Sequence, residues 1–291
     1  MKQDQRWGLL AGLLAVCCWS GFIIVTRLAG LSKLTPYDVM ALRFTVGSFL
    51  LLPFARRWCL INLRGLSLVG VGGIGYTAAV YHGFQQTSAL HGAVLLTGCI
   101  PFTAALFSAW LLQDRPSPMR LFGLSLIAIS GYLMLTESDQ TTSLTGDLWL
   151  LLAALAWGLY TVLIKHWHIP PMSGAVTVAF GSTLFYLPVY LLLLPKHMDV
   201  ASTTEILLQA FYQGLIATVV AMLLYLWAVA SIGPAAMGAL MALVPVVSTV
   251  AALTVLDEQL SLQGGIALAF AFFGAVFSAG LLQRDRMSTP Q

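Results

Sequence analysis

Two long apolar stretches, each with a proline near its middle, constrain this chain more than any other feature. Gly92–Asp114 and Gly238–Glu258 contain Pro101 and Pro245, and each proline lies 13 residues before a carboxylate. Apolar runs of this length span a bilayer as helices. A proline inside such a helix frees the carbonyl four residues earlier, which in hydrocarbon needs a partner. Broken spans at matching places in two halves of a chain indicate a transport site.

Composition excludes a water-soluble fold. Of the 291 residues, 59% are hydrophobic and 9% are charged, whereas soluble domains carry about 25% charged residues. We therefore predict an all-α polytopic membrane protein. The hydropathy pattern predicts ten spans with short loops, at residues 7–28, 37–57, 65–86, 88–113, 119–136, 146–167, 172–194, 205–231, 234–257 and 261–283.

The basic residues predict the orientation of these spans. With a cytoplasmic N-terminus, the inner loops and tails hold ten lysines and arginines, and the outer loops hold only Arg27, Lys33 and Lys196. Such an excess is typical of cytoplasmic loops. With ten spans, both termini are then cytoplasmic. Arg43 is left inside the second span.

The chain also repeats itself. Trp19 lies eight residues before Arg27 near the start, and Trp157 lies eight residues before Lys165 near the middle. We predict a five-helix unit at residues 1–138, a linker at 139–145 and a second unit at 146–291. Because five is odd, the second unit enters the membrane from the opposite side. Such inverted repeats allow one site to face either side in turn.

These paired motifs resemble the drug/metabolite transporter superfamily, in particular its ten-helix EamA-type carriers. The resemblance rests on the Trp–Arg/Lys spacing, on Arg43 with Phe44, and on the two Pro…Asp/Glu segments, and it covers nearly the whole chain. It is closest to the YddG-type amino-acid exporters, which implies a bacterial inner-membrane protein. The two copies differ after the carboxylate, where Arg115-Pro116 follows Asp114 and Gln259-Leu260 follows Glu258.

The residues predicted to contact a substrate are polar or aromatic and lie within the spans. Thr77 and Tyr81 share one helix face, and a polar face inside a membrane points at protein or a cavity. Tryptophans away from the interface can line a cavity, although packing explains them equally well. The predicted set is Trp19, Thr77, Tyr81, His82, Thr97, Pro101, Trp157, Tyr160, Tyr225, Pro245 and Ser248.

Four further residues have two interpretations each. His82, interpreted as the one histidine within a span, can couple transport to protons or can simply bond near a helix end. Arg43 can bind a carboxylate or have a structural role. Asp114 and Glu258 can pair with basic residues to gate the two sides, or can merely mark the interface.

We therefore expect a secondary transporter that exports small metabolites, above all neutral and aromatic amino acids, by alternating access around a central cavity. Another cargo remains open, namely a nucleobase, a sugar derivative or a cationic drug, as does a membrane subunit without transport. We expect no enzyme activity, no cofactor, no metal and no nucleic-acid partner, since no catalytic, metal or phosphate motif is present. The lipid bilayer is the expected surrounding, and a monomer or weak homodimer the expected state.

Overall fold

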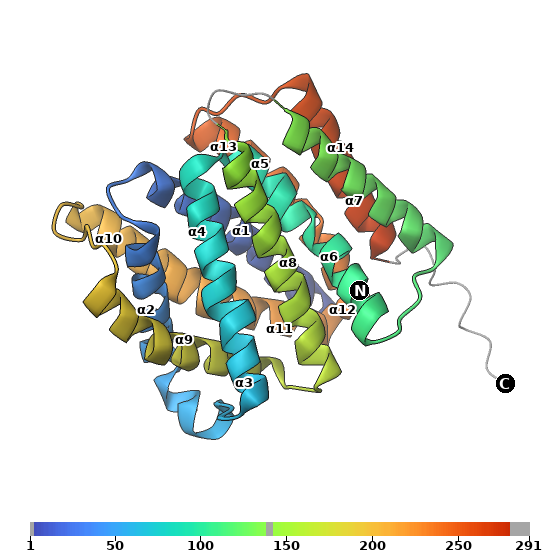
Figure 1. Ribbon diagram of the computed structural model, residues 1–291. Coiled ribbons are helices and arrows are strands. Elements are labelled where there is room, and N and C mark those ends of the chain that lie inside the picture. The colour runs from blue at the N-terminus through green and yellow to red at the C-terminus, as the bar shows by residue number, and fades with distance from the viewer. Residues whose placement is uncertain (1–2, 138–141, 280–291) are drawn as a thin grey trace.

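The computed structural model describes residues 3–137 and 142–279, and every element within these ranges is a helix. In chain order (Figure 1) the helices are α1 (Gln3–Leu31), α2 (Pro36–Trp58), α3 (Leu63–Leu68), η1 (Val69–Gly75), α4 (Tyr76–Gln86), α5 (Ala89–Gly92), η2 (Ala93–Gly98), α6 (Ile100–Leu111), α7 (Pro118–Thr136), α8 (Leu144–His166), α9 (Pro171–Leu193), α10 (Thr203–Gln209), η3 (Ala210–Val220), α11 (Ala221–Ile232), α12 (Pro234–Met241), α13 (Leu243–Val255) and α14 (Leu262–Ser278).

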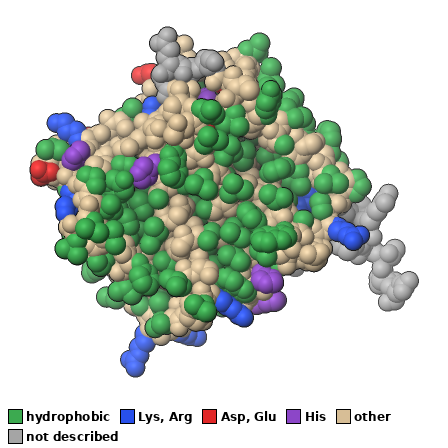
Figure 2. All heavy atoms as spheres, in the orientation of Figure 1, with side chains coloured by type: hydrophobic (Ala, Val, Ile, Leu, Met, Phe, Trp, Pro, Cys, Tyr) green, Lys and Arg blue, Asp and Glu red, His purple; other side chains and the backbone are tan. Residues whose placement is uncertain are grey.

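In the described ranges these helices form ten apolar helical units, which confirms the predicted polytopic all-α fold. Among the described residues, nine continuous helical stretches are long and apolar enough to span a membrane. The tenth unit, α14, has 17 residues and a length of about 26 Å, close to the hydrocarbon thickness of about 30 Å. Its predicted end at residue 283 lies outside the described residues. Hydrophobic side chains cover much of the face seen in Figure 2, and charged ones lie toward its rim.

Hydroxyl and amide side chains fix where the spans begin. Thr35, Ser117, Ser143 and Ser261 each cap a helix by accepting a hydrogen bond from a backbone N–H two or three residues into it. Such caps satisfy donors that have no partner within the helix. These capping residues lie directly after the loops, so each span begins at a defined residue.

Both proline-containing spans are interrupted, as the sequence predicts. The fourth span breaks at Cys99, between η2 and α6, and the ninth breaks at Ala242, between α12 and α13. The two breaks face each other, because a Cβ built on Gly98 would lie 3.9 Å from Cγ of Pro245. Three segments, η1, η2 and η3, are π-helical, which the sequence analysis did not predict. Such segments are common at functional sites.

The packing between spans is paired. Helix α1 packs against α11 and α13, and α8, which occupies the same place in the second half, packs against α4 and α6. Helices α7 and α14 lie side by side at one edge of the bundle, and α2 pairs with α9 (Figure 1). This is the pattern that two similar units related by a twofold axis would produce. The unit boundaries predicted at residues 138 and 146 stay a prediction.

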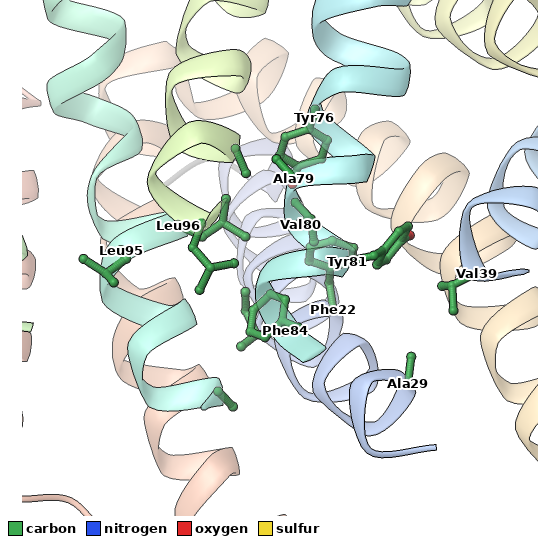
Figure 3. Packing of buried hydrophobic residues seen from close by; sticks show 14 of the residues in the cluster. Phe22, Ala29, Val39, Tyr76, Ala79, Val80, Tyr81, Phe84, Leu95 and Leu96 are labelled. Atoms are coloured by element: carbon green, nitrogen blue, oxygen red, sulfur yellow. The ribbon is translucent and has the colours of Figure 1, made fainter. Parts of the chain in front are cut away.

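Close contacts hold both the centre and the edge of the bundle. In the centre, Tyr76, Val80 and Phe84 of α4 pack into the largest buried cluster (Figure 3). At the edge, α7 and α14 touch backbone to backbone, since a Cβ on Gly123 or Gly274 would lie 2.6 or 2.7 Å from the carbonyl oxygen of the other glycine. Only glycine permits this approach.

Candidate substrate site and the contacts that close one end

The two ends of the bundle differ in how they join the two halves of the chain. We call the end that holds the loops at residues 32–35, 87–88, 194–202 and 256–261 the latched end. The opposite end holds the loops at residues 59–62, 112–117 and 167–170. The predicted gating residue Glu258 lies at the latched end, and Asp114 lies at the opposite end.

Glu258 binds the first half of the chain at three points. Its carboxylate accepts hydrogen bonds from the backbone N–H of Ala89, at 2.8 Å, and of Leu90, at 3.0 Å, at the start of α5. Arg27 Nε lies 3.8 Å from the same carboxylate, while Arg27 Nη1 donates to the carbonyl of Phe84 at 2.9 Å. The carboxylate thus ties the end of α13 to α1, α4 and α5.

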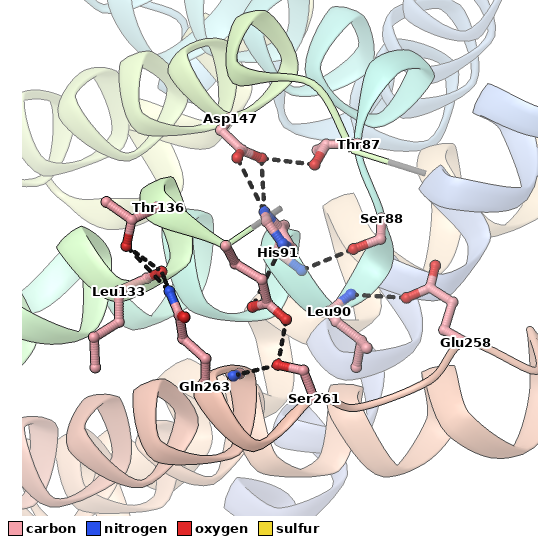
Figure 4. Close-up of polar contacts among 12 residues, drawn as sticks. Thr87, Ser88, Leu90, His91, Leu133, Thr136, Asp147, Glu258, Ser261 and Gln263 are labelled. Carbon is pink, nitrogen blue, oxygen red and sulfur yellow. Dashed lines mark hydrogen bonds and ion pairs between the residues drawn. The ribbon is translucent and has the colours of Figure 1, made fainter. Parts of the chain in front are cut away.

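Two further polar contacts join the halves at the latched end. Asp147 of α8 binds His91 and Thr87 (Figure 4). Asp38 of α2, which is fully buried, accepts a hydrogen bond from the hydroxyl of Tyr190 on α9 at 2.6 Å. All the carboxylates in these contacts are therefore held by donors from the other half.

The opposite end has fewer polar connections between the halves. Asp114 pairs with Arg120 of the same half at 3.0 Å, and Lys165, which matches Arg27 in the repeat, is exposed. The halves meet there largely through apolar packing of α1 against α11 and α12, where Ala11 and Ala15 form a buried cluster with Ala228 and Met237. The N–H of Leu60 also donates to Thr177, and the guanidinium of Arg64 lies over the ring of Trp167. The contact of α1 with α4 has no comparable counterpart between α8 and α11 in the described chain. The polar contacts between the halves are thus concentrated at the latched end.

Between the ends, Arg43 lies among aromatic side chains. Its guanidinium carbon is 5.5 Å from the ring centre of Phe22, and the group is within electrostatic reach of the hydroxyls of Tyr76 and Tyr81. Its Nη1 atom is buried and has no hydrogen-bond partner among the described residues. A buried donor without a partner is costly. It therefore marks a place where a ligand oxygen can bind.

Tyr81 also joins a buried polar chain across the halves. Its hydroxyl donates to Gln213 Oε1 at 3.0 Å, and Gln213 Nε2 donates to Thr26 at 3.0 Å and to Gln209 at 3.2 Å. Gln209 in turn donates to the carbonyl of Val25. A shallow pocket lies beside this chain, lined by Thr26, Ala29, Gly30, Leu34, Pro36, Val39, Tyr81 and Gln85.

The predicted aromatic residues form two separate groups. Trp157 lies 4.8 Å from Tyr76 and 5.3 Å from Tyr160, measured between ring centres, so it belongs to the region around Arg43. Trp19 contacts Tyr225 at 5.5 Å. The matching places in the repeat thus have different partners, and the structure does not bring Trp19 and Tyr225 into contact with the Arg43 group.

The other predicted residues bond mainly to their own helices. The hydroxyls of Thr77, Thr97 and Ser248 donate to carbonyls four residues earlier. Pro245 is buried and Pro101 is half-buried. These two prolines lie at the breaks of their spans. The three hydroxyls already donate their hydrogen, so toward a substrate they could only accept a hydrogen bond.

His82 is not the only histidine within a span, so that interpretation was wrong. His82 is half-buried between Tyr37 and Trp149, whereas His91, 3% exposed, lies inside the fourth span and contacts two carboxylates. Its position near the start of that span, next to a run of small residues, concealed it in the sequence. The buried pair Gln209 and Gln213 was also missed, although their spacing of four residues places both on one face of an apolar span.

Comparison with known proteins agrees with this architecture. The sequence profile described as the EamA-like transporter family matches residues 6–136 and again residues 144–280. The chain belongs to the EamA-like transporter family. The two matches fall on either side of residues 137–143. The identification supports a membrane transporter, a class of protein that is usually not an enzyme.

Individual relatives agree with the family. A protein of Clostridium kluyveri named as an uncharacterized transporter is 23% identical over 86% of each chain, and one of Archaeoglobus fulgidus with the same name is 24% identical over 84% of this chain and 88% of its own. A Pseudomonas aeruginosa protein is 33% identical over 55% of this chain and 56% of its own. A solved crystal structure, 20% identical, superposes with a TM-score of 0.63 over 97% of this chain and all of its own. At this identity the likeness shows the fold alone.

Proposed function

We propose that this transporter exports neutral amino acids, including aromatic ones, across the bacterial inner membrane by alternating access. The observation that carries the proposal is the unpartnered, buried Nη1 of Arg43, which lies near Phe22 and Tyr76, the latter in contact with Trp157 of the other half. A guanidinium binds a carboxylate through two parallel hydrogen bonds. The aromatic rings of Tyr76 and Trp157 offer an apolar surface to the substrate side chain and a cation–π partner to its ammonium.

The proposed orientation of the protein in the membrane follows from the distribution of its basic residues. Arg6, Arg56, Arg57, Arg64, Arg115, Arg120 and Lys165 lie at or near the opposite end, and Arg27, Lys33 and Lys196 lie at the latched end. The positive-inside rule then places the opposite end and both termini in the cytoplasm. We infer that the latched end faces outside and that the polar contacts there close the carrier to the exterior. A carrier in this state is prepared to take up cargo from the cytoplasm.

A cationic drug fits the site less well. The carboxylates of Asp38, Asp147 and Glu258 lie at the latched end and already accept hydrogen bonds. The charge nearest the central aromatic residues is that of Arg43, which repels cations. Nucleobases and sugar derivatives lack the carboxylate that Arg43 would bind, and a subunit without transport would have no need for this free donor.

Transport by the purified protein in liposomes tests the proposal. We expect exchange of labelled phenylalanine well above that of empty vesicles. Phenethylamine, which lacks the carboxylate, should compete poorly. Loss of one charged, buried hydrogen-bonding partner costs about 1.5–3 kcal/mol, so Arg43→Gln should raise the half-saturating phenylalanine concentration about 10- to 100-fold.

A matched arginine provides the control. Arg64, at the opposite end, lies over the ring of Trp167 at 5.9 Å and away from the aromatic group around Arg43. Arg64→Gln should leave phenylalanine exchange close to that of the unmodified protein. Exchange that is absent for every amino acid tested, or equal in Arg43→Gln and Arg64→Gln, would overturn the proposed cargo or the role of Arg43.

A further inference from the structure

His91 lies between the buried carboxylate of Asp147 and the partly buried carboxylate of Glu137 at the latched end (Figure 4). Its Nδ1 atom is 3.0 Å from both carboxylate oxygens of Asp147, and its Nε2 atom is 3.8 Å from Oε2 of Glu137. The side chains of His91 and Asp147 are 3% and 4% exposed. Thr87 donates to the Asp147 carboxylate at 2.6 Å, and Ser261 donates to Oε1 of Glu137.

The donors and acceptors of this cluster do not balance without an additional proton. Because a carboxylate only accepts, Nδ1 of His91 must carry the hydrogen that Asp147 receives. In a neutral imidazole, Nε2 would then present a lone pair toward Oε2 of Glu137. That oxygen is buried and has no hydrogen-bond partner among the described residues. A proton bound at Nε2 replaces this repulsion with the attraction between an imidazolium and the Glu137 carboxylate, 3.8 Å away.

The additional proton also joins the halves of the transporter. His91, Thr87 and Glu137 belong to the first five spans, and Asp147 and Ser261 belong to the second five. Without the proton, the buried carboxylate of Asp147 and the partly buried one of Glu137 would both face a neutral ring. Separation of the halves would relieve this by admitting water. The bound proton therefore stabilises the closed arrangement of the latched end over the open one.

The other charged groups at this end do not replace the proton. Glu258 and Arg27, on the elements packed against the other side of α5, largely neutralise each other and bind the backbone of residues 84–90. Asp38 is held by Tyr190 on the far side of α2. Asp139 lies outside the described residues. The charge next to His91 is thus that of Asp147 and Glu137.

We propose that His91, Asp147 and Glu137 form a proton-binding site whose occupancy holds the latched end closed. The ligand is a proton taken from water, and the bond that forms at Nε2 or Oε2 breaks again when the halves separate, so no other reactant is needed. Proton binding itself does not depend on the cargo. Its use as the coupling ion of export rests on the proposed function above.

Cysteine accessibility in the purified, substrate-free protein tests the site. The reporter is Ala29→Cys in a chain whose four native cysteines are replaced by alanine, because Ala29 is 4% exposed and lines the shallow pocket of the latched end. The reference is Val200→Cys in the same background, since Val200 is 52% exposed at this end. The ratio of the two maleimide labelling rates cancels the pH dependence of the thiol.

We expect the labelling rate of Ala29→Cys, divided by that of Val200→Cys, to fall by about tenfold as the pH decreases from about 8 to about 6. A one-proton linkage changes an equilibrium by up to tenfold per pH unit. His91→Gln should abolish the pH dependence. Glu137→Gln should keep labelling low at every pH. Its side-chain amide can turn an N–H toward the lone pair of His91 Nε2, which removes the repulsion without a bound proton. His82→Gln is the control and should retain the full dependence, because the contacts of His82 are Ala78, Tyr37 and Trp149.

A pH-independent ratio in the reporter protein, or an unchanged dependence in His91→Gln, would overturn the proton site. A transport measurement separates this outcome from the cargo. In liposomes, an imposed pH gradient should accumulate phenylalanine through the unmodified protein, whereas His91→Gln should allow only exchange. Phenylalanine exchange with pH-independent labelling would contradict the proton site alone. Proton-dependent labelling without any amino-acid flux would contradict the cargo alone.

Discussion

The latched end and the opposite end carry matching residues with different partners. Arg27 and Glu258 meet across the halves, whereas their counterparts Lys165 and Asp114 do not, because Lys165 is exposed and Asp114 binds Arg120. A carrier built from two similar units must break their symmetry in each of its two states. The difference between the ends therefore describes the conformation that the structure captures, and equivalent substitutions at the two ends should have unequal effects.

The largest difference is expected between Glu258→Ala and Asp114→Ala. Loss of the Glu258 carboxylate leaves two backbone donors and Arg27 without their acceptor, and breaking a buried charged pair costs about 3 kcal/mol. This should raise labelling of the Ala29→Cys reporter, relative to Val200→Cys, about 100-fold at fixed pH. Asp114→Ala should change the ratio less than about threefold, because its ion pair is local and partly exposed.

Equal labelling of these two variants would contradict the assignment of Glu258 to the closure of the latched end. The comparison requires that both variants remain monodisperse in detergent. The labelling rate of Val200→Cys shows whether the general reactivity of the protein has changed.

A smaller difference is expected between Arg27→Gln and Lys165→Gln. Arg27 donates to the carbonyl of Phe84 and neutralises Glu258, but the backbone donors of Ala89 and Leu90 would still hold that carboxylate. We expect about a tenfold rise in reporter labelling, equivalent to about 1.4 kcal/mol. Lys165→Gln should have no measurable effect at the latched end. An equal response to both substitutions would mean that net charge, rather than the Arg27 contact, controls closure.

The smallest difference is expected between Tyr81→Phe and Tyr225→Phe. Tyr81 donates to Gln213 Oε1 inside the protein, so its removal leaves a buried acceptor unsatisfied at a cost of about 1 kcal/mol. The melting temperature should fall by about 2–4 °C. The hydroxyl of Tyr225 has no recorded hydrogen bond in the described structure, and its loss should shift the melting temperature by less than about 1 °C. Thermal unfolding followed in detergent distinguishes the two.

Much of the fold could be predicted from the sequence because the membrane restricts the choices. Apolar runs between short polar loops define the spans, and Pro101 and Pro245 define the two breaks to within three residues. The pairing of Glu258 with a basic residue was foreseen as one of two interpretations. These features depend on local composition and on the repeat, which a single sequence displays.

The asymmetry of the site could not be predicted in the same way. Trp19 and Trp157 occupy equal positions in the repeat, yet Trp19 contacts Tyr225 and Trp157 contacts Tyr76. His91 acquires its two carboxylate neighbours only when the start of α8 and the end of α7 meet α5. Such contacts depend on which conformation the two units adopt, and a repeat in sequence carries no information about that choice.

The backbone contact between Gly123 and Gly274 has a mechanical consequence. A side chain at either position would force α7 and α14 apart, because each Cβ would fall within 3 Å of the facing backbone. Any movement of the two halves that keeps this backbone contact must therefore pivot at the edge formed by α7 and α14.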